Sequence, residues 1–380
     1  MFMTTSLFDP SADSEGLERN KRIAWGHFRA LAEGRLADAL AVIDETGTYW
    51  RNLNFEGACP TVSLQVWKDG VRAMIERRLP IPWHAGHVHL VNIFAEGDQV
   101  VLEIHNDSVP YHEGARNESY DMVYLFAVRI REGRIVSLRE YLDGFLMRSM
   151  LADGSAPELG TDWLDLRAME KRTPPPLSPS ACAYCGMVHQ ANLADIADGA
   201  PDWPEPNSPA ANKRIVREHF RALIEGRLDD AVAMLDMGGV FWGAARIGAD
   251  PRRVFSIEFW RRELAGMIDH RFAMPWSDGV HLLNVVAEGD QVLFEIHNMS
   301  TLRPPIGGRY NAIYSWVFTL RDGKIADIRQ YPDGLYAVEM HKLFYPGTGG
   351  TVSPLTMGGE LPPVVLEEGS CLSCGKVHRS

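Results

Sequence analysis

The residues best suited to chemistry lie in a stretch that occurs twice in the chain. Residues 95–108 read AEGDQVVLEIHNDS and residues 287–300 read AEGDQVLFEIHNMS, so ten of the first twelve positions are identical. A Glu-Gly-Asp turn followed by this pattern predicts a β-strand whose alternate side chains face one side. In the first copy that side carries His105 and Asp107, whereas the second copy has Met299 in place of the aspartate. An acid–base pair is therefore present in one copy and lost from the other.

A histidine and a carboxylate two positions apart on a strand suit acid–base catalysis without an organic cofactor. Their side chains lie about 7 Å apart on one face, close enough to exchange protons with one bound substrate. We predict His105 and Asp107 as catalytic residues, with Glu140 on a neighbouring strand completing the set. The alternative is that His105 is a buried core histidine. That alternative is favoured by His297, which occupies the same place in the copy that lacks the acid.

Two copies of a cysteine motif are the sharpest local signal. Residues 182–189 read CAYCGMVH and residues 371–378 read CLSCGKVH. The CxxCG pattern is typical of a zinc knuckle, in which a tight turn directs two thiolates to one ion. We predict a structural zinc bound by both motifs together, or two separate sites in which His189 and His378 add a third ligand. Redox-active or unligated cysteine pairs are the alternative. The predicted metal ligands are Cys182, Cys185, Cys371 and Cys374.

The scaffold that must position these residues is an internal duplication. Residues 20–44 and 212–236 match at seventeen of twenty-five positions, and their apolar spacing predicts two successive helices in each copy. A short strand, a third helix and four long strands then follow, which predicts an α+β fold with helices on one face of a curved antiparallel sheet. In the first repeat the later elements are expected at 48–52, 62–79, 88–94, 99–109, 120–130 and 135–143. In the second repeat the helices are expected at 212–235 and 254–270, and the strands at 280–286, 291–302, 309–320 and 324–331.

The chain therefore divides into two tandem domains with two loose segments. We predict a catalytic domain at 17–150, a Pro-rich linker with the first knuckle at 151–208, a second domain at 209–345 and a tail with the second knuckle at 346–380. The second domain is expected to be a degenerate copy. Where the first has Asp107 and Glu140, it has a methionine and a glutamine, and neither can act as a general base.

Composition limits the class of partner. The net charge is −12, from 50 acidic against 38 basic residues, which argues against nucleic acid and against an anionic membrane surface. The first residues lack the basic and apolar regions of a signal peptide, and no run of about 18 apolar residues predicts a membrane span. We expect a cytoplasmic protein, with a possible homo-oligomeric state, that acts on a small hydrophobic substrate.

The order of helices and strands, closed by a turn of the type Asp-Gly-Lys-Ile and a Tyr-x-Asp-Gly run, resembles the nuclear-transport-factor-2-like superfamily. SnoaL-like cyclases, ketosteroid isomerases, scytalone dehydratase and limonene epoxide hydrolase belong to it. The resemblance implies a cone-shaped fold that holds a small hydrophobic ligand between sheet and helices. In a comparison with limonene epoxide hydrolase, Trp50 and Asn52 fall on the first short strand, where that family has a tyrosine and an asparagine. Asp107 and Glu140 fall at its two carboxylates, and His105 replaces its arginine.

A histidine–carboxylate pair is more similar to the dehydratase branch of this superfamily. The resemblance therefore implies a cofactor-independent lyase or dehydratase that eliminates water or a small fragment from a small hydrophobic, aromatic or polyketide-like alcohol. An epoxide hydrolase or isomerase/cyclase on the same scaffold, and a ligand-binding or scaffold protein without chemistry, are the alternatives. The predicted substrate-binding residues are Tyr49, Trp50, Asn52, Tyr120 and Tyr124.

Overall fold

The structure of the protein is a computed structural model. It describes residues 10–52, 61–76, 83–108, 121–143, 182, 188–189, 191–193, 207–244, 253–276, 279–332, 361, 364, 366, 368–371 and 374–378. None of the helices in these ranges is both long enough and apolar enough to cross a lipid bilayer.

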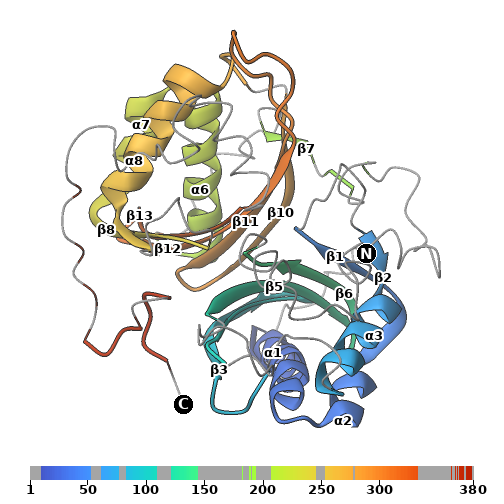
Figure 1. Ribbon diagram of the computed structural model, residues 1–380. Helices are drawn as coiled ribbons and strands as arrows, with labels where there is room; N and C mark the ends of the chain where they lie inside the picture. The colour runs from blue at the N-terminus through green and yellow to red at the C-terminus, as the bar shows by residue number, and fades with distance from the viewer. Residues whose placement is uncertain are drawn as a thin grey trace, which may run out of the picture.

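The first domain is a six-stranded sheet covered on one face by helices (Figure 1). The strand order is β2-β1-β6-β5-β4-β3. The sheet is mixed rather than purely antiparallel, because β1 pairs with β6 in parallel. Strands joined by hairpins must run antiparallel to each other. The connection from β1 to the next long strand instead passes through β2 and a helix, so β1 is free to pair in parallel with β6. The elements are α1 (Pro10–Ala32), α2 (Leu36–Ala41), β1 (Ile43–Arg51), β2 (Thr61–Ser63), α3 (Leu64–Ile75), β3 (Val88–Glu96), β4 (Gln99–Asn106), β5 (Met122–Arg131) and β6 (Arg134–Tyr141).

The second domain repeats this plan and adds a strand from the segment between the domains. Strand β7 (Ala191–Asn192) pairs with the edge strand β10, giving the order β7-β10-β11-β12-β13-β8-β9. Helix α6 begins after Ser208, whose side chain accepts a hydrogen bond from the Ala211 amide at 3.2 Å. The remaining elements are α6 (Pro209–Ile224), α7 (Leu228–Ala233), β8 (Leu235–Gly243), β9 (Val254–Ser256), α8 (Ile257–Gly266), a π-helical turn η3 (Met267–Arg271), β10 (Val280–Glu288), β11 (Gln291–Asn298), β12 (Ala312–Arg321) and β13 (Lys324–Pro332).

These bounds refine the sequence prediction at the element ends. The helix expected at 62–79 begins with the short strand β2 and becomes helical at Leu64. The strand expected at 48–52 begins five residues earlier, at Ile43. The helix expected at 254–270 likewise begins as strand β9 and ends in a π-helical turn. Short apolar runs fit a helix and a strand equally well, so periodicity alone does not separate these ends.

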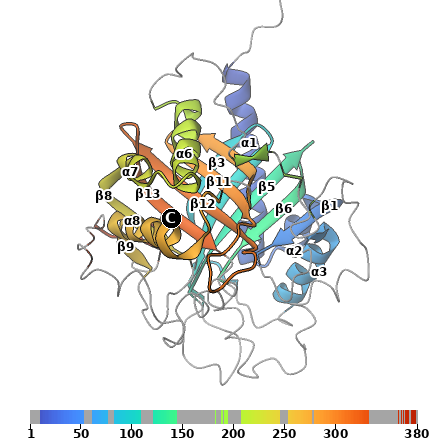
Figure 2. The same cartoon turned by 90° about the horizontal axis from the view of Figure 1, so that it is seen from above.

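The two sheets pack against each other, with the helices on the outer sides (Figure 1). Figure 2 shows the strands of one sheet lying across those of the other. Successive side chains of β4 point to opposite faces of the sheet. Val100, Leu102 and Ile104 pack under the helices, whereas Val101 belongs to a separate core between the sheets. Each domain therefore has its own core, and the chain has a third core where the domains meet.

Buried ion pairs cross this interface in a reciprocal manner. The Arg329 guanidinium in the second domain contacts Glu103 of the first at 2.5 Å, and Tyr331 donates a hydrogen bond to the same carboxylate. Burial would raise the pKa of Glu103, but Arg329 and Tyr331 more than offset this and lower it. The mirror-image contacts join Arg139 and Tyr141 to Glu295. Equivalent residues of the two repeats thus contact each other's domain.

Candidate functional site

The interior of the first domain holds a buried carboxyl group. Glu140 on β6 is 5 % exposed and lies directly opposite Phe126 of β5 in the sheet register. Tyr49 on β1 donates a hydrogen bond to the Glu140 carboxylate. The Tyr49 ring lies 5.2 Å from that of Trp67. Phe28, Trp83 and Tyr124 complete an aromatic wall under the helices.

The protonation of this pair is set by its surroundings. Burial raises the pKa of Glu140, while the hydrogen bond from Tyr49 and the charge of Arg51 act in the opposite direction without cancelling it. Burial, and then the nearby Glu140 charge, raise the pKa of Tyr49 well above its usual value. Tyr49 therefore remains a protonated donor, and the Glu140 carboxyl group holds its proton more strongly than a carboxyl group in water does.

The predicted substrate-binding residues divide between the two faces of the sheet. Tyr49 and Tyr124 belong to the core under the helices, as expected. Trp50 packs instead in the core between the domains, and the Asn52 amide donates to the Pro332 carbonyl of the second domain at 2.9 Å. These two residues join the domains rather than line the first interior. Tyr120 lies outside the described residues.

Asp107 lies just beyond the end of β4 and does not meet Glu140 in the first interior. Its side chain is 40 % exposed, and its carboxylate is 3.1 Å from the His87 ring and 3.6 Å from the His89 ring. The structure thus does not bring the three predicted catalytic residues together. Glu140 faces the helices, Asp107 lies at the rim, and His105 faces the second domain.

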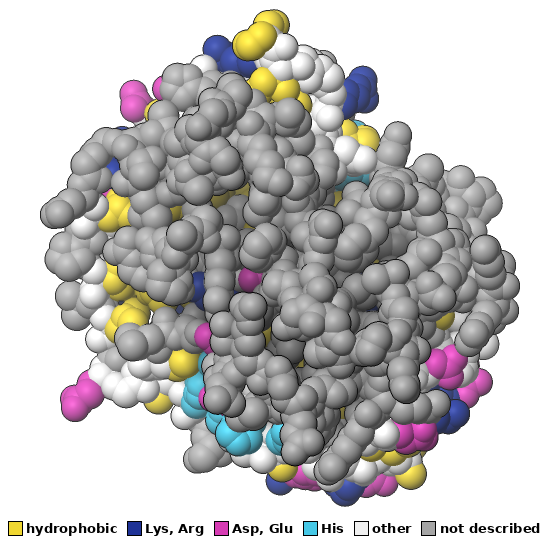
Figure 3. Space-filling view, in the orientation of Figure 1, with side chains coloured by type: hydrophobic (Ala, Val, Ile, Leu, Met, Phe, Trp, Pro, Cys, Tyr) yellow, Lys and Arg dark blue, Asp and Glu magenta, His cyan; other side chains and the backbone are white. Residues whose placement is uncertain are grey.

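His105 lies at the centre of a cluster with the C-terminal segment. Its Nδ1 atom is 3.0 Å from His378 Nε2 and 3.8 Å from Cys371 Sγ, and Cys374 Sγ is 3.2 Å from the same His378 nitrogen. One ligand atom from each of these four residues lies within 4.8 Å of all the others. We call His105, Cys371, Cys374 and His378 the tail cluster. Histidine side chains gather on the surface where β3 and the C-terminal segment meet (Figures 1 and 3).

The segment between the domains forms a matching cluster on the second domain. His297 Nδ1 is 3.2 Å from His189 Nε2 and 3.8 Å from Cys182 Sγ, and these three residues also form a group with metal-ligand spacing. We call them the linker cluster. Cys185, the second cysteine of this motif, lies outside the described residues. Among those the structure describes, the two motifs belong to two separate groups, each centred on a histidine of the sheet.

The groups of the tail cluster carry opposite charges. The hydrogen bond with Cys374, together with His105, lowers the pKa of the Cys371 thiol to about 3 despite partial burial. The same hydrogen bond and burial raise the pKa of the Cys374 thiol. Burial would lower the pKa of His105, but the hydrogen bond with Asp121 and the contact with Cys371 raise it to about 9. The Cys371 thiolate therefore faces a protonated imidazole, which stabilises its negative charge.

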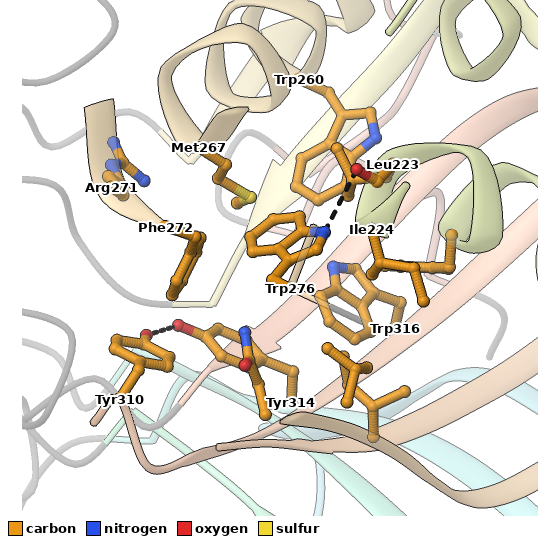
Figure 4. Close-up of a pocket in the computed structure, with 14 residues that line it drawn as sticks. Leu223, Ile224, Trp260, Met267, Arg271, Phe272, Trp276, Tyr310, Tyr314 and Trp316 are labelled. Carbon is orange, nitrogen blue, oxygen red and sulfur yellow. Dashed lines mark hydrogen bonds between the residues drawn. The ribbon is translucent and has the colours of Figure 1, made fainter. Parts of the chain in front are cut away.

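The second domain contains a small cavity under its helices (Figure 4). Its volume is about 50 Å³, which is far smaller than the roughly 300–1,000 Å³ of ordinary small-molecule pockets. The Tyr310 and Tyr314 hydroxyl groups are hydrogen-bonded to each other at one wall. Arg271, at the opposite side, is paired with Glu263 at 2.8 Å. The aromatic walls come from Phe220, Trp260, Phe272, Trp276 and Trp316.

Comparison with known proteins agrees with this architecture. The model of the SnoaL-like domain matches residues 26–138 and again residues 216–328. The chain belongs to the SnoaL-like domain family. Both matches lie inside the domains described above, so the predicted tandem α+β fold is confirmed. No curated protein matches the sequence.

Solved structures similar to the chain cover 35–38% of it. A proposed SnoaL-like polyketide cyclase from Jannaschia sp. CCS1 is 18% identical, covering 38% of this chain and 97% of its own, with a TM-score of 0.29. A proposed isomerase from Bacillus subtilis is 15% identical over 36% and 94%, with a TM-score of 0.28. An NTF2-like protein from Burkholderia xenovorans LB400 is 18% identical over 35% and 96%, with a TM-score of 0.25. At these identities the likeness concerns the fold alone.

Two residues near the clusters were missed from the sequence. Asp121 accepts a hydrogen bond from His105 Nε2 at 2.7 Å, and Asn311 occupies the same place beside His297 at 2.6 Å. Both stand immediately before a long strand in equivalent positions of the SnoaL-like repeats. A comparison of polar residues at matching strand starts would have found them.

Proposed function

We propose that the first SnoaL-like domain is a cofactor-independent acid–base lyase of the dehydratase type. Its substrate class is a small hydrophobic, aromatic or polyketide-like alcohol. The observation that carries the proposal is the Glu140 carboxyl group, buried among aromatic rings and hydrogen-bonded to Tyr49. A carboxyl group with a raised pKa in an apolar interior is a common arrangement for proton transfer near neutral pH.

The reaction uses Glu140 twice. The carboxylate removes a proton from the carbon next to the carbinol carbon, and that electron pair forms the C=C bond as the C–O bond breaks. Glu140 then delivers the same proton to the departing hydroxide, so the products are an alkene and one water molecule. Tyr49 holds the carboxylate by its hydrogen bond throughout. No group other than the carboxyl changes its protonation state over the cycle.

The proposal assigns no proton transfer to His105. Its two ring nitrogens are already engaged, one by Asp121 and the other by the tail cluster. It also lies on the sheet face that meets the second domain, opposite to the face that carries Glu140. Asp107 remains a predicted second carboxylate at the rim, where it contacts His87 and His89.

The test is a dehydration assay with a panel of aromatic β-hydroxy ketones, which become strongly absorbing enones when they lose water. We expect Glu140→Gln to lower kcat/KM about 10²–10⁴-fold, as for loss of a general acid–base group. Tyr49→Phe should have a smaller effect, because it removes only the hydrogen bond that positions the carboxylate. Gln330→Ala is the matched control, since Gln330 occupies the equivalent place in the second domain, and its rate should equal that of the wild type.

Equal turnover by the wild type and Glu140→Gln on an active substrate would contradict the proposal. Reaction in ¹⁸O-labelled water separates elimination from epoxide hydrolysis, because a hydrolase incorporates the label into its diol product whereas this elimination adds no oxygen.

A second candidate function is ligand binding without chemistry in the second domain. The specific observation is the Trp316 indole Nε1 beside the cavity, which is buried and has no hydrogen-bond partner among the described residues. A ligand small enough for this cavity and carrying one carbonyl oxygen would satisfy this donor. Titration with small aliphatic ketones, followed by tryptophan fluorescence, tests this role. Binding that is lost in Trp316→Phe and kept in Glu140→Gln would favour it over catalysis in the first domain.

A further inference from the structure

We propose that the tail and linker clusters are two separate Cys₂His₂ zinc sites, each completed by a histidine from a sheet. The tail site uses Cys371, Cys374, His378 and His105. The linker site uses Cys182, His189 and His297. Its fourth ligand, Cys185, is taken from the CxxC motif of the sequence, because it lies outside the described residues. Each site attaches the segment that follows one domain to the sheet of the other domain.

The distances in the tail cluster lie close to the edge lengths of a zinc tetrahedron. Bonds of about 2.3 Å to sulfur and 2.0 Å to nitrogen place neighbouring ligand atoms about 3.3–3.8 Å apart. The observed separations are 3.0 Å for His105 Nδ1 to His378 Nε2, 3.2 Å for Cys374 Sγ to His378, and 3.8 Å for Cys371 Sγ to His105. The knuckle turn is formed as well, since the Gly375 amide donates to the Cys371 carbonyl at 2.7 Å.

The hydrogen bonds on the far side of each sheet histidine select the ligand nitrogen. Asp121 accepts from His105 Nε2 at 2.7 Å, and the Asn311 side-chain oxygen accepts from His297 Nε2 at 2.6 Å. Each Nε2 therefore carries a hydrogen, so Nδ1 is the nitrogen that faces the cluster and would bind the ion. Such a second partner is the usual companion of a histidine that binds a metal.

The linker cluster repeats these features independently. His297 Nδ1 lies 3.2 Å from His189 Nε2 and 3.8 Å from Cys182 Sγ, close to the values in the tail cluster. In both places a further histidine stacks on the knuckle histidine: His89 on His378 at 4.2 Å and His281 on His189 at 4.5 Å. Neither stacked histidine belongs to the groups with ligand spacing, so both serve as internal controls.

The tail site bridges the domains because its knuckle also contacts the second domain. Arg329 donates to the Cys374 carbonyl at 2.6 Å while it pairs with Glu103 of the first domain. Gly375 packs against Val254, so closely that an added Cβ would lie 3.3 Å from it. Zinc bound to His105 would thus fix the first domain to a segment anchored on the second.

The test is a zinc count on the full chain by mass spectrometry, after saturation with zinc and removal of the excess. We expect about two zinc ions per chain in the wild type, about one in His105→Gln, about one in His297→Gln and close to none in the double variant. The matched controls His89→Gln and His281→Gln should keep about two. Zinc-free protein refilled with Co²⁺ should show the thiolate-to-cobalt charge-transfer band and the intense visible absorption of tetrahedral sites.

Three results would overturn the proposal. A wild-type chain with less than about half an ion after saturation would exclude the sites. Two ions retained in His105→Gln, or an equal loss in His89→Gln, would exclude the ligand assignment. Since the cobalt spectrum is recorded on the wild type, absence of the charge-transfer band would also exclude thiolate ligands even if every variant failed to fold. None of these results depends on the proposed enzyme activity.

Discussion

The two domains are alike on the sheet faces where they meet and different in the interiors under their helices. On the sheet faces that contact each other, both repeats have a glutamate, an arginine and a tyrosine in equivalent places, and each set binds the other domain. Under the helices, the repeats differ at the positions that carry chemistry. The first domain has Tyr49, Arg51 and Glu140 where the second has Phe241, Gly243 and Gln330.

This difference shows what each face must do. The interface contains two equivalent ion pairs, and each repeat supplies one partner of both, so a change in either repeat leaves a buried charge of the other domain without its partner. The interior of each cone has no such constraint, and one copy can exchange its carboxylate for an amide. The shared histidine at positions 105 and 297 belongs to the contacting faces, which explains why it occurs in the copy that lacks Asp107.

The largest expected effect comes from breaking the reciprocal ion pairs. Arg329→Met would leave Glu103 buried without its guanidinium, and Arg139→Met would do the same to Glu295. We expect each to lower the free energy of unfolding by about 3–5 kcal/mol, measured by denaturant titration. Lys21→Met, which removes the outer pair with Glu288, should cost less than about 1 kcal/mol. A loss in Arg329→Met as small as that of the control would contradict a reciprocal interface.

An intermediate effect is expected from the one chemical difference between the two clusters. Asp121 supports His105 with a carboxylate, whereas Asn311 supports His297 with a neutral amide. We expect Asp121→Asn to weaken zinc binding at the tail site about 10–100-fold, and Asn311→Asp to strengthen it at the linker site. Competition with a chelator of known affinity measures both. Unchanged affinities would show that these partners do not act on a metal ligand.

The smallest effect concerns the stability of the first interior. Burial raises the pKa of Glu140 above its value in the unfolded chain. The contribution of Glu140 to the stability of the folded protein is therefore largest at low pH, where its carboxyl group is neutral. That stability is lost as the pH rises through the folded pKa. Glu140→Gln should therefore raise the melting temperature by roughly 2–4 °C at about pH 8, and by less at about pH 5. A variant that is less stable than the wild type at about pH 8 would contradict a buried, raised-pKa carboxyl group.

Sequence reasoning predicted the tandem fold well, because the duplication and the strand periodicity are strong signals. It also placed His105 and Asp107 on one side of a strand. The alternation of side chains along a strand does not tell which side of the strand faces the helices, however. Both faces of β4 are buried here, so no polar face distinguishes the side that faces away from the helices. For the same reason, the sequence did not show that Trp50 and Asn52 lie where the two domains meet.

The charged residues inside strands were the missed signal for the interface. Glu103 and Arg139 lie inside strands rather than at their ends, and they recur as Glu295 and Arg329. Buried charges are tolerated when paired, and the repeat supplies a partner for each from the other domain. The sheet histidine that we propose as a further ligand of each cysteine motif was equally hidden, because it lies far from the motif in sequence and in the opposite repeat.

The most direct test of the account is a crystal structure of the zinc-loaded full chain with anomalous data at the zinc absorption edge. We predict two separate anomalous peaks, one within bonding distance of His105 Nδ1 and the tail cysteines, and one within bonding distance of His297 Nδ1 and the linker cysteines. A single peak shared by the four cysteines, or peaks distant from both sheet histidines, would contradict it.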